Sequence, residues 1–186
     1  MRARGFIIAG VLGLTLSGCQ GTSGTPTSDS GMSASALAAT PPSGVVLPRR
    51  DLTPGLADPQ ATTDIVCHRS TKTVRNVPLS VHDQVYAEYG ITHHITGEYE
   101  VDHLIPLEVG GSNDIKNLWP EPANPVPGFH QKDVLENALH AKVCDGSVNL
   151  SDAQTQIATN WYAAYVRYCG TDGSGCDKYK YQGNGS

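Results

Sequence analysis

Residues 98–119 read EYEVDHLIPLEVGGSNDIKNLW and carry the most informative pattern in the chain. Residues 99–109 have strand character and lead into Gly110-Gly111, where free choice of φ suits a tight turn. Residues 115–119 are expected to return as a second short strand. The pattern therefore predicts a β-hairpin.

Asp102 and His103 are neighbours in the first expected strand. Because successive side chains of a strand face opposite sides, the two share a pocket only where the strand ends or kinks. Pro106 favours such a break, since proline cannot donate to a strand ladder. Asn117 lies on the returning strand.

These residue types suit the cleavage of a phosphodiester. Attack by water needs a general base with a pKa near neutrality, which histidine provides. A hard divalent ion takes oxygen ligands from Asp and Asn side chains and neutralises the charge on the phosphate. The layout predicts His103 as base and a metal ion on Asp102 and Asn117. Mg²⁺ is the first expectation, with Mn²⁺ or another transition metal as the alternative.

The spacing of these motifs resembles a known signature. Asp-His-Leu-Ile-Pro-Leu at 102–107, Gly-Gly-Ser-Asn at 110–113 and Asn-Leu at 117–118 resemble the HNH endonucleases, which have the ββα-metal fold. The resemblance covers roughly residues 98–140. The sequences NLWPEP and KDVLEN that follow are similar to those of secreted bacterial members.

The resemblance implies a role for each matching residue. His103 takes the role of the family's general base, and Asp102 that of a metal ligand. Asn117 either binds the metal or pins the hairpin. The third signature residue lies on a helix, where His130 is the candidate ligand, and Asp133, Glu136 and Asn137 are alternatives. The paired C-x-x-C zinc knuckles of many relatives are missing from this sequence.

The N-terminus has the features of an export signal. Arg2 and Arg4 precede an apolar run at 6–16, which is too short to span a bilayer. The run ends in Leu-Ser-Gly-Cys at 16–19, which resembles the lipobox of bacterial lipoproteins and implies that Cys19 is acylated. A plain signal peptide or an uncut anchor is the alternative.

These features divide the chain into three parts. Residues 1–18 are the expected lipoprotein signal peptide, and residues 19–45 form a flexible tether rich in Ser, Thr and Pro. Residues 46–186 form the nuclease-like domain. The expected location is extracytoplasmic, in the outer membrane or cell envelope, with the lipid on Cys19 as the membrane contact.

Cysteine usage agrees with an oxidising compartment. Besides Cys19 the chain has four cysteines, which indicate two disulfides outside the cytosol. Of the three pairings we favour Cys169–Cys176 across a glycine-rich loop, with Cys67–Cys144 joining the ends of the core. A zinc site is the rival interpretation.

Helical patterns surround the hairpin. Helices are expected at 80–89 and at 130–143, and a third begins at the capping box of Ser151 and Gln154 and continues to Tyr168. Prolines exclude regular structure between 120 and 129, and the tail after Cys176 is expected to be loose. The fold class is α+β, a small ββα-metal core with flanking helices, braced by disulfides.

Composition limits the partners. The chain has 186 residues, 39% hydrophobic and 17% charged, with a formal net charge of −5, which fits one soluble domain.

The expected function is a metal-dependent endonuclease for DNA, with RNA as a further substrate, without strong sequence specificity. A non-catalytic, disulfide-braced binding module is the alternative, and an inhibitor protein is left open as a partner. Six basic residues are candidates for phosphate contacts or for a solvated face: Arg69, Lys72, Arg75, Lys116, Lys132 and Lys142.

Overall fold

A computed structural model of the chain describes residue 41 and residues 44–180. Two antiparallel strands, β1 (Tyr99–His103) and β2 (Leu118–Pro122), form a sheet in which Asp102 pairs with Trp119. The described residues also form five α-helices: α2 (Thr63–His68), α3 (Leu79–Glu88), α4 (Phe129–Cys144), α5 (Leu150–Thr159) and α6 (Trp161–Cys169). The fold class is α+β, as predicted.

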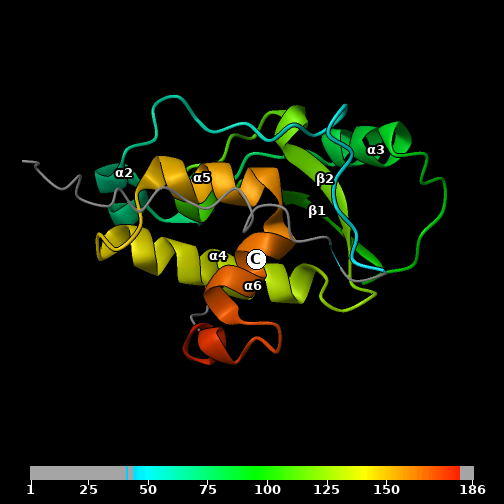
Figure 1. The fold of residues 1–186 in the computed structure, drawn as a ribbon. Coiled ribbons are helices and arrows are strands. Elements are labelled where there is room, and N and C mark those ends of the chain that lie inside the picture. The colour runs from blue at the N-terminus through cyan, green and yellow to red at the C-terminus, as the bar shows by residue number, and fades with distance from the viewer. Residues whose placement is uncertain (1–40, 42–43, 181–186) are drawn as a thin grey trace, which may run out of the picture. The chain divides into compact units, whose positions relative to one another are not determined.

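In Figure 1, α2, α4, α5 and α6 lie on one side of the sheet and α3 lies on the other. Helix α4 packs against α2, α5 and α6, while α3 packs against β2. The apolar stripe of α4 is buried, as its spacing predicts, with Leu135, Ala138 and Leu139 fully inaccessible. Trp161 of α6 lies in the same core, where its indole N–H donates to the carbonyl of Val46.

The hairpin differs from the prediction of two strands joined by a tight turn. Strand β1 ends at His103, and residues 104–117 make a long connection with 3-10 helices at Leu107–Val109 (η2) and Ile115–Asn117 (η3). The second strand therefore begins only at Leu118 and includes Pro120 and Pro122. Proline is tolerated there because β2 is an edge strand.

The expected third helix is two helices. Asn160 is extended, with φ −164° and ψ 96°, and its side chain accepts a hydrogen bond from the N–H of Ala163 to cap α6. Asn160 therefore ends α5 and begins α6, and the chain changes direction between the two helices. The predicted capping box at Ser151 is absent, since Asn149 precedes α5 without a side-chain cap.

The expected loose tail is ordered as far as Lys180. A 3-10 helix at Ser174–Tyr179 (η4) packs against α4 and α6, and Tyr179 is buried. Tyr179 lies in the main apolar core, which holds the tail in place.

Both favoured disulfides are present. Cys67–Cys144 joins α2 to α4, and Cys169–Cys176 joins the end of α6 to η4. The predicted signal peptide and Cys19 lie outside the described residues, as does most of the predicted tether. Within the part of the chain that the structure describes, no helix is long and apolar enough to cross a membrane.

Candidate active site

Asn117 holds the connection between the strands in place. Its Oδ1 accepts hydrogen bonds from the backbone N–H groups of Leu56 and Ile105, at 3.1 and 3.0 Å. Its Nδ2 donates to the carbonyls of Ile105 and Ser112, both at 2.9 Å. Both amide hydrogens and both accepting positions of this fully buried side chain are used. Of the two roles expected for Asn117, metal binding and pinning of the hairpin, this geometry fits the second.

The two glycines of the motif are required for different reasons. Gly110 takes the left-handed conformation at φ +76°, which ends η2. Gly111 is needed because a Cβ at that position would lie 1.7 Å from the carbonyl oxygen of Ile105. This close approach lets Asn117 reach both sides of the connection.

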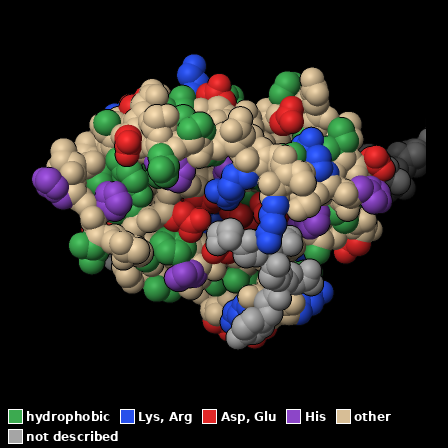
Figure 2. Space-filling model, turned by 180° about the vertical axis from the view of Figure 1, so that it is seen from behind, with side chains coloured by type: hydrophobic (Ala, Val, Ile, Leu, Met, Phe, Trp, Pro, Cys, Tyr) green, Lys and Arg blue, Asp and Glu red, His purple; other side chains and the backbone are tan. Residues whose placement is uncertain are grey.

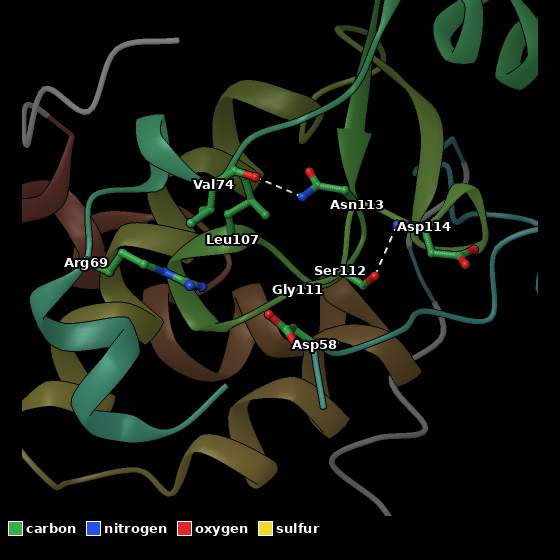
Figure 3. A pocket seen from close by; sticks show the side chains of 8 residues that line it. All are labelled: Asp58, Arg69, Val74, Leu107, Gly111, Ser112, Asn113 and Asp114. Atoms are coloured by element: carbon green, nitrogen blue, oxygen red, sulfur yellow. Dashed lines mark hydrogen bonds between the residues drawn. The ribbon is translucent and has the colours of Figure 1, made fainter. Parts of the chain in front are cut away.

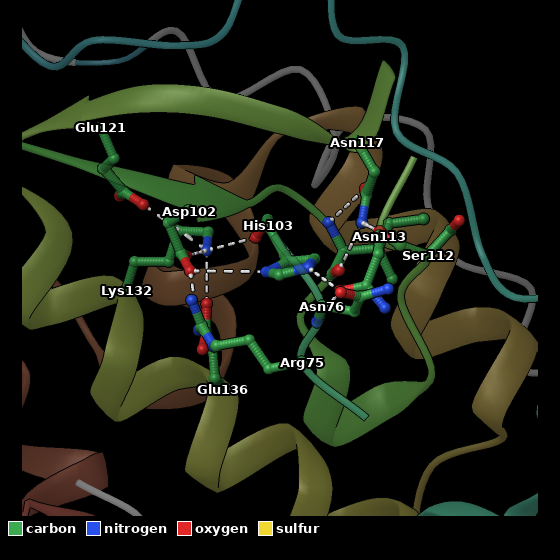
Figure 4. Close-up of polar contacts among 11 residues, drawn as sticks. Arg75, Asn76, Asp102, His103, Ser112, Asn113, Asn117, Glu121, Lys132 and Glu136 are labelled. Carbon is green, nitrogen blue, oxygen red and sulfur yellow. Dashed lines mark hydrogen bonds and ion pairs between the residues drawn. The ribbon is translucent and has the colours of Figure 1, made fainter. Parts of the chain in front are cut away.

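Asp102 and His103 are brought together at the end of β1, as the break in the strand predicts (Figure 4). The Asp102 Oδ1 atom lies 3.9 Å from the His103 Nδ1 atom. Both residues are buried, and His103 is 1% exposed. The pair therefore shares one water-poor space.

Asn113 determines which ring nitrogen of His103 carries the proton. Its Nδ2 donates to the carbonyl of Val74 at 2.8 Å, and its Oδ1 accepts from the N–H of Asn76 at 3.1 Å. These two partners fix the amide orientation and present Oδ1 to the His103 Nε2 atom at 3.1 Å. A carbonyl oxygen only accepts, so Nε2 carries the hydrogen and Nδ1 keeps a lone pair.

The lone pair on His103 Nδ1 is exceptional for a buried atom. Nδ1 has no hydrogen-bond partner among the described residues. Burial lowers the pKa of His103 to about 4, below the near-neutral value expected from the sequence for a general base, although the nearby Asp102 carboxylate opposes the shift. The imidazole is therefore neutral at pH 7, with an acceptor that faces the Asp102 carboxylate.

Lys132 was a candidate for a phosphate contact or for a solvated face, and its burial contradicts both. Its side chain is fully buried, and its ammonium donates to Asp102 Oδ2 at 2.7 Å, to the His103 carbonyl at 2.8 Å and to Glu136 Oε1 (Figure 4). Glu121 Oε2 lies 3.5 Å away. Lys132 and Glu136 occupy the buried face of α4 with Leu135 and Leu139, but their i, i+4 spacing is equally that of an exposed ion pair, so the sequence carried no signal that separates the two.

The charges of this cluster are strongly coupled. Burial alone lowers the pKa of Lys132, but the surrounding carboxylates outweigh it and leave that pKa well above its ordinary value. Burial would raise the pKa of Asp102, but Lys132 and His103 lower it, so Asp102 is ionised. Burial raises the pKa of both Glu121 and Glu136 well above the usual range. Neither carboxyl oxygen of Glu121 has a hydrogen-bond partner among the described residues.

Arg75 lies between this cluster and solvent. Its guanidinium Nη2 is 3.6 Å from Asp102 Oδ1, and its side chain is 44% exposed. Figure 2 shows acidic side chains gathered in a hollow on one face, with Lys and Arg side chains beside it. Loss of surrounding water, together with the charges of Asp102, Glu100 and Glu108, raises the pKa of Asp133 to about 7. The candidate site thus combines a surface cation with several acids.

A pocket of about 370 Å³ lies on the other side of Asn113 (Figure 3). Arg69, one of the six basic residues that were candidates for phosphate contacts or a solvated face, lines it together with Ser112, Asp58 and Asp114. Arg69 and Arg75 therefore lie at the pocket and at the Asp102 carboxylate, respectively. This arrangement gives the segment before α3 contact with both parts of the site.

The predicted metal ligands are not brought together. Asn117 uses its oxygen on backbone groups, and His130 is exposed on the first turn of α4, where its ring contacts Phe129. Asp102 Oδ2 is bonded to Lys132. Among the described residues, Asp102 and His130 belong to no group of three His, Cys, Asp or Glu ligand atoms close enough to share an ion. The side chains do not fit the three-ligand metal site expected from the sequence.

One such group does occur elsewhere. Cys67, His140 and Cys144 place their ligand atoms within 4.8 Å of one another. The two sulfurs form a disulfide, however, and His140 Nε2 lies 3.0 Å from the carbonyl of Val66. In the oxidised protein this group braces α2 against α4, so the zinc interpretation does not apply to it.

Comparison with protein-family models, with curated proteins and with solved structures found no match to this chain.

Proposed function

We propose that this chain is an HNH-type endonuclease that hydrolyses phosphodiester bonds of DNA, and of RNA as a further substrate, without strong sequence specificity. The observation that carries the proposal is the orientation of His103. Asn113 holds Nε2 as the protonated nitrogen, and Nδ1 presents an unpaired lone pair beside Asp102. A neutral imidazole held in one tautomer is suited to accept a proton.

The reaction follows from this geometry. A water molecule that donates to Nδ1 loses a proton to it as its oxygen attacks the phosphorus. The bond from phosphorus to the 3′ oxygen breaks, the departing 3′ alkoxide takes a proton from solvent water, and Nδ1 returns its proton to solvent. The imidazolium formed lies 3.9 Å from the ionised Asp102 carboxylate, which stabilises its charge. The half-exposed guanidinium of Arg75 is placed to contact the phosphate.

The resemblance to HNH enzymes implies a divalent metal ion, with Mg²⁺ first. Since the predicted ligands do not assemble around Asp102, no step of this mechanism passes through a metal ion. The activity experiment therefore compares cleavage in Mg²⁺, in Mn²⁺ and in EDTA.

We further propose that the enzyme acts outside the cytoplasm, held in the outer membrane or cell envelope by a lipid on Cys19. Two disulfides in one domain are typical of an oxidising compartment, which supports this location. The lipobox resemblance at 16–19 is the sequence feature behind it. Labelling with a radioactive fatty acid should modify the wild-type chain and leave Cys19→Ser unlabelled.

The test of activity uses the lipid-free chain, residues 19–186 with Cys19→Ser, in oxidised form. Plasmid DNA and RNA are incubated with it in Mg²⁺, in Mn²⁺ and in EDTA, beside a folded His103→Ala variant. We expect cleavage by the wild type and its loss in His103→Ala. Cleavage that survives in His103→Ala contradicts the assignment of the base.

The non-catalytic binding module is the second candidate. The observation that favours it is the 1% exposure of His103 together with the acidic surroundings of the site. A folded wild-type protein that cleaves no nucleic acid under any of these conditions would support the module. The same preparation then serves for binding measurements.

A further inference from the structure

The cation beside Asp102 is part of the chain itself. An ammonium group has three N–H donors, and those of Lys132 reach Asp102 Oδ2, the His103 carbonyl and Glu136 Oε1. Glu121 Oε2 completes a surround of four oxygens, three of them from carboxyl groups. This is the kind of oxygen set that hard divalent cations bind.

We propose that Lys132 is a built-in cation that fills the place of a divalent metal ion beside Asp102, so that the Asp102–His103 site needs no bound metal ion. The proposal rests on the proposed nuclease function for its catalytic consequence. Its structural content, which cation Asp102 binds, can be tested without activity.

Position and charge both support this role. Asp102 uses Oδ2 for Lys132, and its Oδ1 faces His103 and the guanidinium of Arg75 at 3.6 Å. A metal ion on Asp102 would have to displace Lys132 or share the carboxylate with two positive groups. Electrostatic repulsion at such short range in a buried site opposes the second arrangement.

Lys132 is a positioning residue. It is fully buried and all its donors are used, so it does not reach a phosphate. It acts through Asp102, which it keeps ionised, and through the His103 carbonyl, which fixes the end of β1. Contact with the substrate is left to Arg75 on the surface.

The test measures Mn²⁺ binding to the lipid-free chain by electron paramagnetic resonance and by the melting temperature. The wild type should bind no Mn²⁺ at Asp102, so Asp102→Asn should leave its Mn²⁺ binding unchanged. Lys132→Met keeps the length of the side chain but leaves its four oxygens without a cation. This variant should gain Mn²⁺ binding and melt several degrees higher with the ion. Lys116→Met, at an exposed lysine, is the matched control and should gain neither.

Each outcome bears on the proposal. Wild-type Mn²⁺ binding that Asp102→Asn abolishes overturns it, and so does a folded Lys132→Met that binds no Mn²⁺. If Lys132→Met does not fold, the wild-type comparison with Asp102→Asn decides alone. Cleavage that persists in EDTA supports the proposal, and cleavage that EDTA abolishes and Mn²⁺ restores contradicts it. A wild type that cleaves nothing refutes the nuclease function, while the Mn²⁺ measurement still decides which cation Asp102 binds.

Discussion

Asn117 and Glu121 are both fully buried polar residues, one just before β2 and the other within it, yet they differ completely in their partners. Asn117 makes four hydrogen bonds with the backbone, whereas neither carboxyl oxygen of Glu121 has a hydrogen-bond partner among the described residues. A paired buried group stabilises the fold, and an unpaired one costs free energy. The connection around Asn117 is therefore built for stability, whereas Glu121 and the Nδ1 atom of His103 keep unmet polar capacity among the described residues.

The largest expected effect concerns His103, whose Nδ1 atom has no hydrogen-bond partner among the described residues. His103→Ala removes the lone pair of Nδ1 and should lower the rate of plasmid cleavage by about 10²–10⁴-fold, the usual contribution of a general base. The circular dichroism spectrum should stay that of a folded protein, while the melting temperature should fall, because the variant loses a buried ring and the hydrogen bond from Nε2 to Asn113. A cleavage rate that falls only in proportion to the folded fraction at the assay temperature would break the comparison.

The next largest effect concerns Asn117, whose side chain is fully hydrogen-bonded. Asn117→Ala leaves two N–H groups and two carbonyls of the backbone without partners, which should lower the free energy of unfolding by about 4 kcal/mol. Urea denaturation measures this. Asn137→Ala is the control, since its amide makes one long hydrogen bond of 3.4 Å to Tyr179, and it should cost less than about 1 kcal/mol. Similar losses in both variants would refute the pinning role.

The connection around Asn117 and the charged cluster around Lys132 also differ in how far the sequence predicts them. The helical stripe of α4 and the meeting of Asp102 with His103 follow from spacing, since period and strand ends are local properties. The disulfides were the favoured choice among three pairings, and Cys67–Cys144 joins residues 77 positions apart, which no local pattern determines. The stabilising role of Asn117 was one of two readings, because an amide that binds metal and one that binds backbone have the same sequence context.

The charged cluster was beyond the reach of local patterns. Lys132 and Glu136 have the i, i+4 spacing of an exposed ion pair, and only tertiary packing against β1 and β2 makes them buried. The break at Asn160 and the prolines in β2 were missed for a related reason. A side-chain cap and an edge position override the run of helix- or loop-forming residues around them.

Asn113 provides an intermediate effect, because it connects a paired network to the unpaired nitrogen. In Asn113→Asp, a carboxylate faces the Nε2–H of His103 and should raise the pKa of this ring from about 4 toward higher values. Protonated His103 cannot accept a proton, so the acid limb of the pH–rate profile should move to higher pH. The wild type should stay active down to about pH 5 and lose activity through about pH 4.

The control for this shift is Asp114→Asn at the exposed neighbouring position, which retains the oxygen that accepts from Lys116. Its pH–rate profile should match that of the wild type. An unshifted acid limb in Asn113→Asp would mean that Asn113 does not set the protonation of His103.

The smallest expected effect concerns the carboxyl of Glu121, which lies 3.5 Å from the Lys132 ammonium but has no hydrogen bond among the described residues. Burial raises the pKa of Glu121 well above its ordinary value of 4.5, so above that pH the folded chain holds a proton that the unfolded chain releases. The contribution of Glu121 to the stability of the wild type therefore falls as pH rises above about 4.5. Glu121→Gln keeps the shape without the titration and should be more stable than the wild type at pH 8, by about 1 kcal/mol or about 3 °C in Tm. At pH 4 the two should melt together, since the carboxyl is then largely protonated in both states. A Glu121→Gln variant that is less stable at pH 8 would mean that the carboxylate is ionised and paired with Lys132, and the contrast with Asn117 would disappear.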